Sequence, residues 1–371
     1  MVTTFGQVSL DKRHPWAAPD NGISISPLLQ RNYLHHLAEV VPARAAKLLN
    51  SVLGQRLCSA TQAQRLLDLY GSSPAVTTAL ERPQTGEEQS PLPLRQLDAA
   101  ATKNDGQSPV VYGMFDGLML PCDEGYEETK IGRVFSDDQI YSLTKGTDKE
   151  QLSTRRRVAN SDYIAQRGHY EAFTERLTRL VQAKVKQVEE TYSQIQAPIR
   201  PVFITDGARW MADYISREFA GCVHIVDFFH AFEHICDYGK VAYPQADNRQ
   251  AYLEQKKAEL RNGEVAKIID ELAPRCDESG SLVAKAAYSL HTYLTNNATR
   301  MRYDNYRAQG YLIGSGAIES AARSVVQQRC KLSGQRWNEG LQPVLNIRCL
   351  YESGKAKRMD KIILDHYRKR A

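Results

Sequence analysis

The sequence predicts an α/β protein built on a mixed sheet, and three observations support this. After a linker-like stretch, three β-rich runs separated by turn residues suggest a meander at 110–121, 127–136 and 139–145. Two short buried runs, 202–205 and 222–226, flank a helical segment, and such a strand–helix–strand unit is parallel and right-handed. Most of the remaining chain has the apolar spacing of amphipathic helices.

Composition and pattern divide the chain into six segments. We expect a helical N-terminal module, a linker, the first part of an α/β core, a helical insertion, the last helix region of the core and a basic tail, at 1–71, 72–108, 109–239, 240–310, 311–354 and 355–371. The linker is rich in Ser, Pro, Gly, Gln and Glu. The tail carries seven basic residues against two acidic ones.

The N-terminal module contains short helices joined by turns, the last of which ends at Gly71. A helix-turn-helix DNA reader is one interpretation, with exposed positions on its second helix at Thr61, Gln62, Gln64 and Arg65. A plain helical hairpin is the alternative, since two short helices joined through a glycine are common.

The overall composition is that of a globular protein. The 371 residues are 42% hydrophobic and 25% charged, with a formal net charge of +5. Seven cysteines form no C-x-x-C pair, which fits reduced thiols rather than a cysteine-rich zinc site. Because no run approaches the length of a membrane span and no signal pattern opens the chain, we expect a cytoplasmic protein.

Four acidic residues lie at positions of this pattern where a ligand-binding site is expected. Asp206 and Asp227 end the two strands of the parallel unit and should share one sheet edge, where open α/β sheets bind ligands. Asp116 lies in the first strand, and Glu319 lies on a late helix after Gly314-Ser315-Gly316. A three-strand meander, a helix and then strand–helix–strand is the order of a ribonuclease H-like fold.

Each acid also has a simpler interpretation. Asp116-Gly117 could form a hairpin turn, and Asp206-Gly207 could cap a helix. Glu319 could complement the helix dipole or pair with Arg323. Together, however, three carboxylates suit phosphodiester cleavage, in which two Mg²⁺ or Mn²⁺ ions stabilise the attacking and the leaving oxygen.

Several longer motifs resemble one family, the ISKra-type bacterial insertion-sequence transposases. They are Phe115-Asp116-Gly117, Thr205-Asp206-Gly207-Ala208, the run from Val226 to His234, the run from Gly314 to Ser320, Val325 to Arg329 and Ser333 to Trp337. The resemblance covers roughly residues 20–355. It implies a DDE triad on Asp116, Asp206 and Glu319, with an all-helical insertion before Glu319.

The same resemblance extends to the Asp-x-x-His signature of Mutator-type transposases, which falls on Asp227 and His230. It implies an accessory role for this pair, either in positioning the metal site or in holding DNA beside it. The sequence departs from the family in one respect: the cysteines of the N-terminal zinc ribbon that the group often carries are absent.

Basic, amide and aromatic residues border the last two motifs. Lys and Arg can neutralise phosphates, and aromatic rings can stack on unpaired bases. The predicted DNA-binding residues are Arg300, Arg302, Arg323, Gln327, Arg329, Lys331, Arg336 and Trp337. The run Arg155-Arg156-Arg157 is instead interpreted as a solvated face.

Two other functions compete with the transposase hypothesis. His230-Ala231-Phe232-Glu233-His234 matches the inverted zinc-peptidase motif, with His230 and His234 as ligands and Glu233 activating water. A catalytically inactive DNA-binding derivative of a transposase would retain the same acids. For the active enzyme we expect binding to terminal inverted repeats and target DNA, a homodimer or larger assembly, and a nucleoid-associated location.

Overall fold

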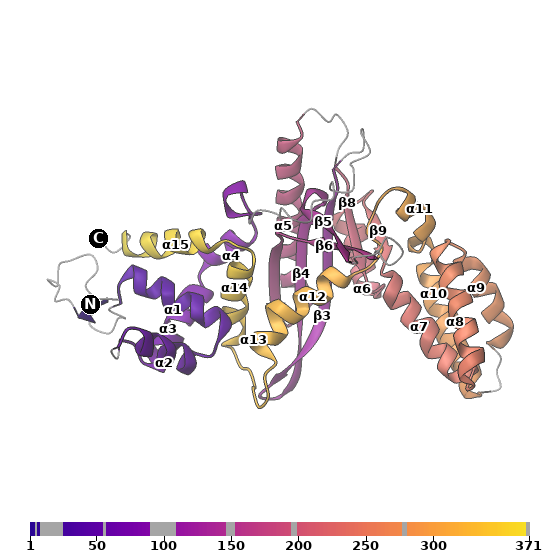
Figure 1. Cartoon of the computed structure of the whole chain (residues 1–371), viewed down its shortest axis with the longest axis horizontal. Coiled ribbons are helices and arrows are strands. Elements are labelled where there is room, and N and C mark those ends of the chain that lie inside the picture. The colour runs from indigo at the N-terminus through magenta and orange to yellow at the C-terminus, as the bar shows by residue number, and fades with distance from the viewer. Residues whose placement is uncertain are drawn as a thin grey trace. The chain divides into compact units, whose positions relative to one another are not determined.

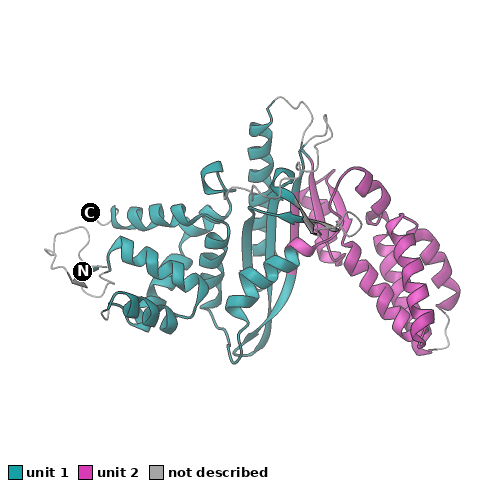
Figure 2. Cartoon of the chain, in the orientation of Figure 1, with its two compact units in different colours: residues 1–111, 117–199, 318–371 teal, residues 112–116, 200–317 magenta. Residues whose placement is uncertain are grey.

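The computed structural model describes residues 1–3, 6–7, 25–54, 57–89, 109–145, 153–193, 199–276 and 280–368. They form a mixed α/β structure around a five-stranded sheet of order β7-β4-β3-β8-β9 (Figure 1). The strands are β3 (Val111–Cys122), β4 (Gly125–Ser136), β7 (Asp162–Arg167), β8 (Pro201–Thr205) and β9 (Val223–Val226). The chain separates into two compact units, residues 1–111, 117–199 and 318–371 and residues 112–116 and 200–317 (Figure 2).

The predicted parallel unit is confirmed. β8 and β9 pair in parallel, with Phe203 opposite His224, and α6 (Arg209–Glu218) connects them. Both strands are short; β8 is buried after its first residue, and β9 is buried in its second half.

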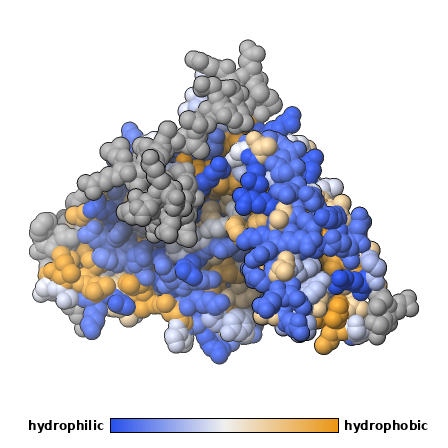
Figure 3. Space-filling model, turned by 45° about the vertical axis from the view of Figure 1, so that its right-hand side comes forward, coloured by the Kyte–Doolittle hydropathy of each residue, from blue (hydrophilic) through white to orange (hydrophobic). Residues whose placement is uncertain are grey.

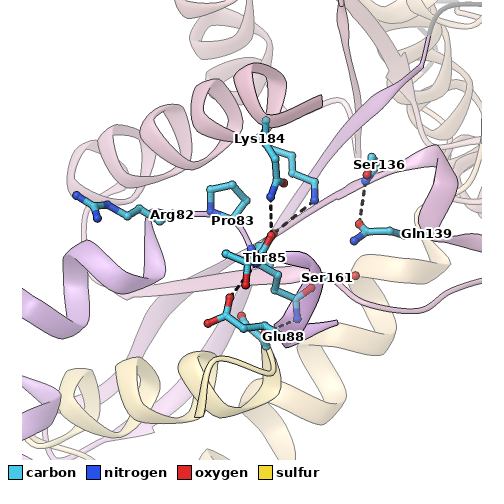
Figure 4. Close-up of polar contacts among 12 residues, drawn as sticks. Arg82, Pro83, Thr85, Glu88, Ser136, Gln139, Ser161 and Lys184 are labelled. Atoms are coloured by element: carbon cyan, nitrogen blue, oxygen red, sulfur yellow. Dashed lines mark hydrogen bonds and ion pairs between the residues drawn. The ribbon is translucent and has the colours of Figure 1, made fainter. Parts of the chain in front are cut away.

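The predicted meander is wrong in its third strand. β4 pairs antiparallel with β7, whereas β5 (Ile140–Lys145) pairs with β6 (Ser153–Val158) in a separate two-stranded ribbon. The 3₁₀ turn η3 (Asp137–Gln139) separates β4 from β5, and the Gln139 side chain accepts a hydrogen bond from the Ser136 amide at 3.0 Å (Figure 4). Arg156 and Arg157 of β6 are exposed, in agreement with a solvated face.

The first unit combines the N-terminal helices with the C-terminal ones. Its helices are α1 (Pro27–Glu39), α2 (Pro42–Val52), α3 (Ala60–Gly71), α4 (Pro74–Leu80), η1 (Gly86–Glu88), α5 (Tyr170–Thr191), α13 (Gln328–Cys330), α14 (Leu341–Glu352) and α15 (Ala356–Arg368). Proline opens three of them at the first helical position, where its missing N–H costs nothing. The predicted amphipathic helix is α5, which buries Phe173, Leu177 and Leu180.

Helix α14 is the centre of this unit. It packs against β7 and also against α1, α3 and α4. A Cβ atom on Gly71 would lie 2.5 Å from the Pro343 carbonyl oxygen, so only glycine allows this approach of α3 to α14. The N-terminal module is therefore not a separate domain, because its core is completed by a segment about 270 residues later.

The segment predicted as a basic tail contains a helix. Residues 356–368 form the amphipathic helix α15, which buries Met359, Ile363 and Tyr367 and lies beside α1 (Figure 1). The first part of the linker is likewise structured, since α4 and η1 lie within it. The rest of the predicted linker, residues 90–108, falls outside the described residues.

A buried polar cluster joins four segments of the first unit. Asp162 of β7 has no exposed surface; it lies 2.8 Å from Lys355 Nζ and accepts a 2.9 Å hydrogen bond from the Gln84 amide. Lys184 of α5 points toward the same group from 4.0 Å (Figure 4). Burial lowers the pKa of Lys355, which Asp162 opposes. Removing Asp162 would leave two buried cations, at a cost of about 3–5 kcal/mol.

The second unit combines the parallel strands with a helical bundle. Its helices after α6 are α7 (Phe228–Ala242), α8 (Ala246–Arg261), α9 (Val265–Leu272), η4 (Ala273–Arg275), α10 (Leu282–Asn297), η5 (Ala298–Arg300) and α11 (Tyr303–Ala308). The described residues between 240 and 310 contain helices and no strand, in agreement with a helical insertion. Helix α12 (Gly316–Ala321) follows and continues into the π-helical segment η6 (Ala322–Gln327). Among the described helices, none has the length and hydrophobicity that crossing a membrane requires.

Candidate active site

Asp206 stands at the carboxyl end of β8, directly after four buried residues. Its Oδ1 accepts one hydrogen bond, from the Ala208 amide at 2.8 Å, and Gly207 between them has a φ of 91°. Asp206 is partly exposed. Its other carboxylate oxygen, Oδ2, forms no hydrogen bond or ion pair with the described residues. Asp206 therefore keeps a carboxylate oxygen available for a ligand.

Asp116 lies on the strand next to β8. Phe115 is buried against Trp210 and Tyr214 of α6 and contacts Phe203 of β8, so this side of β3 faces α6. Side chains alternate along a strand, which places Asp116 on the opposite face. Phe203 of β8 packs on Phe219 at the end of α6. Asp206 follows the last residue of β8, so both acids lie on or directly after neighbouring strands of the sheet.

Asp227 ends β9 but is used differently. It is buried and caps α7, accepting hydrogen bonds from the Phe229 and His230 amides, the latter at 3.1 Å. Its second oxygen accepts a 2.6 Å hydrogen bond from the Ser315 amide. Asp227 thus connects the loop before α12 to the end of β9, and its accessory role stays a prediction.

A polar cluster lies at the end of β8, and of its members only Arg300 is a predicted site residue. Thr205 Oγ1 lies 2.8 Å from His224 Nε2, and burial, followed by the charge of Arg300, lowers the pKa of His224 to about 3. Arg300 donates a 2.6 Å hydrogen bond to Asn297 Oδ1. No local pattern could have revealed His224, because in the sequence it is one position of a short β-run.

His230 and His234 lie one turn apart on α7, with ring centroids 4.9 Å apart. His230 Nδ1 is 3.6 Å from Glu233 Oε2, and the His234 ring packs on Tyr293 at 3.9 Å. Burial, then the nearby His230, lowers the pKa of His234. The His234 ring is therefore engaged in packing against α10 rather than directed freely to solvent.

Glu319 is exposed in the first turn of α12, three residues before the π-helical segment. Short π-helical insertions are frequent at functional sites. Glu319 belongs to the first compact unit, whereas Asp116 and Asp206 belong to the second.

The described ranges contain no cluster of three or more His, Cys, Asp or Glu side chains close enough to hold a metal ion. Among these residues there is thus no group of three such side chains around His230 and His234. The donor chemistry of Asp116 and Asp206 nevertheless fits Mg²⁺, which proteins commonly bind through one or two carboxylates together with substrate phosphates and water.

The predicted DNA-binding residues fall into three groups by exposure. Arg302, Arg323, Lys331 and Arg336 are exposed and form no ion pair with described residues. Arg300 and Gln327 are partly exposed. On the face shown in Figure 3, most of the described surface is hydrophilic and hydrophobic residues form smaller patches.

The remaining two predicted DNA-binding residues, Arg329 and Trp337, are buried. The Arg329 guanidinium lies over the Trp337 ring at 5.5 Å, and Trp337 Nε1 donates to the Cys330 carbonyl at 2.7 Å. Their placement corrects the sequence prediction, because a base or phosphate cannot reach side chains that pack inside the first unit.

The possible helix-turn-helix has fewer available positions than predicted. Gln62 completes a capping box with Ser59, and Gln64 donates to Asp68 at 2.8 Å. Thr61 and Arg65 remain exposed. In comparisons with known proteins, no family model matches the chain and no curated protein is significantly similar to it.

Proposed function

We propose that this chain is a DDE-type DNA transposase with a ribonuclease H-like core, cleaving and rejoining DNA with two Mg²⁺ or Mn²⁺ ions. The observation that supports the proposal is the position of Asp116 in β3 and of Asp206 directly after β8, the neighbouring strand of the sheet. The motifs shared with ISKra-type transposases add Glu319 as the third carboxylate.

Each residue then has a role that follows from its chemistry. Asp116, Asp206 and Glu319 would hold the ions, which supply a nucleophilic water and stabilise the leaving oxygen. Exposed Arg323, Lys331 and Arg336 would neutralise DNA phosphates, so binding should weaken steeply with added salt. A 3′-OH released by cleavage would then attack target DNA, with two ends held in a dimer or larger assembly.

Cleavage of a supercoiled plasmid that carries the chain's coding region with its genomic flanks tests the proposal. In Mg²⁺, Asp116→Ala, Asp206→Ala and Glu319→Ala should each reduce cleavage about a thousandfold, since ions held by these groups contribute several kcal/mol. DNA binding measured by gel shift should persist. Asp213→Ala, an exposed acid on α6 of the second unit, is the matched control.

The outcomes separate the candidate functions. Cleavage retained by one of the three variants removes that residue from the triad. DNA binding by the wild-type protein without cleavage in either metal identifies an inactive derivative. We do not advance the zinc-peptidase alternative, because His234 packs on Tyr293 and the described residues bring no third ligand to the histidine pair.

A further inference from the structure

Two tyrosines of the helical insertion bind the ends of the two parallel strands. Tyr293 of α10 donates its hydroxyl to the Asp206 carbonyl at 3.0 Å. Tyr303 of α11 donates its hydroxyl to the Val226 carbonyl, the last of β9, at 2.9 Å. The insertion is therefore hydrogen-bonded to Asp206 itself and to Val226, the residue before Asp227.

The contacts at Asp206 are the more extensive. A Cβ atom on Gly207 would lie 2.9 Å from Asn297 Oδ1, so α10 also packs closely on the turn that follows Asp206. Asn297 is itself held by its hydrogen bonds to Arg300 and to the Tyr293 carbonyl. The Tyr293 ring is fixed on its other side by His234. One helix of the insertion thus restrains both the backbone of Asp206 and its neighbour.

This restraint of the backbone matters because few contacts orient the Asp206 carboxylate directly. A single hydrogen bond from the Ala208 amide orients it, and its side chain is partly exposed. The direction of the carboxylate then depends on the backbone of residues 206–208. Residues that orient a metal ligand without touching the metal strongly influence the affinity of the site for the metal.

We propose that Tyr293 is a positioning residue through which the helical insertion sets the orientation of the Asp206 carboxylate. The proposal rests on the proposed function, in which Asp206 is a metal ligand. It assigns a role to the insertion beyond any contact with DNA, because displacement of α10 would change the geometry at Asp206.

The test is Mn²⁺ binding to the DNA-free protein, followed by electron paramagnetic resonance, with wild type, Tyr293→Phe and Asp206→Asn. Removing one hydroxyl should weaken Mn²⁺ binding about tenfold and raise by a similar factor the Mg²⁺ concentration that gives half-maximal cleavage. Tyr303→Phe is the matched control, since it removes the equivalent bond from β9, and it should leave both metal readouts unchanged.

The two levels of proposal fail in different ways. If wild type and Asp206→Asn bind Mn²⁺ equally, Asp206 is not a ligand and the proposed function loses its basis. If Asp206→Asn loses binding but Tyr293→Phe equals wild type, the positioning role is overturned. Should Tyr293→Phe not fold, Asn297→Ala removes the side chain packed on Gly207 and should show the same weakening; wild-type affinity in that variant would equally overturn the role.

Discussion

The ends of β8 and β9 differ although their sequences are alike. Each strand is short and is followed first by an aspartate and then by a helix. Asp227 accepts hydrogen bonds from three backbone amides and is buried, whereas Asp206 accepts one and is partly exposed. An aspartate whose two carboxylate oxygens both accept hydrogen bonds from backbone amides stabilises the fold. An aspartate with one oxygen that accepts no such bond can bind a ligand.

Of the two strand-end aspartates, Asp227 is expected to contribute more to stability. Asp227→Ala leaves the first amides of α7 and the Ser315 amide without their acceptor, and we expect a loss of about 3 kcal/mol. Chemical denaturation followed by circular dichroism measures it. Asp237→Ala, an exposed acid on the same helix, is the control and should change stability by less than about 0.5 kcal/mol. A loss at Asp227 as small as that of the control would contradict a structural role.

A smaller and pH-dependent effect is expected beside Thr205. Because His224 has a pKa of about 3 when folded, well below its ordinary value of 6.5, the unfolded chain takes up a proton first as the pH falls. Stability should be full above about pH 6.5 and should decline below it by at most about 1.4 kcal/mol per pH unit. His224→Gln removes the titrating group and should decline less between pH 7 and pH 5. Equal declines in denaturation experiments would exclude His224 as the cause.

Glycine substitutions provide a third comparison. Gly207→Ala places a Cβ atom both at a positive φ and against Asn297, and we expect a loss of about 2 kcal/mol. Gly221→Ala has a similar φ of 78° but open space around it, so about 1 kcal/mol is expected. Thermal unfolding of the two variants measures the difference, and equal losses would show that the packing of α10 on this turn contributes nothing.

The smallest effect on stability is expected at Asp206 itself. Asp206→Ala removes one hydrogen bond from a partly exposed turn, so the loss should stay below about 1 kcal/mol. Denaturation alongside Asp227→Ala makes the comparison direct. A loss that matches Asp227→Ala would mean that Asp206 holds the fold together, and any loss of DNA cleavage would then need another explanation.

The sequence predicted those parts of the fold whose signal is local. The parallel unit and α5 were found because buried runs and an amphipathic stripe identify them within a few residues. β7 was missed, since its six residues bury only Asp162, Ile164 and Ala165 and pair with a strand that ends 26 positions earlier. The burial of Arg329 and Trp337 was missed because the local sequence around a basic and an aromatic residue does not indicate whether the two side chains are exposed or packed in a core.

The candidate site was predictable only in part for the same reason. Asp206 and Asp227 were located correctly at strand ends, but the sequence could not rank them, because the amide of Ser315 lies 88 positions beyond Asp227. Tyr293 was not distinguishable from any other aromatic residue of a helix. Its contact with Asp206 joins residues 87 positions apart.

The buried cluster around Asp162 and the position of α14 have a consequence for synthesis of the chain. Residues 27–80 leave the ribosome long before 341–367, which cover them in the finished protein. Until then their apolar faces lack the helix that buries them, and such nascent segments are prone to aggregate. Emergence of residues 341–367 from the ribosome is therefore the event that allows helices α1 to α4 to reach their final packing. Ribosome stalling before this segment emerges would yield an aggregation-prone product.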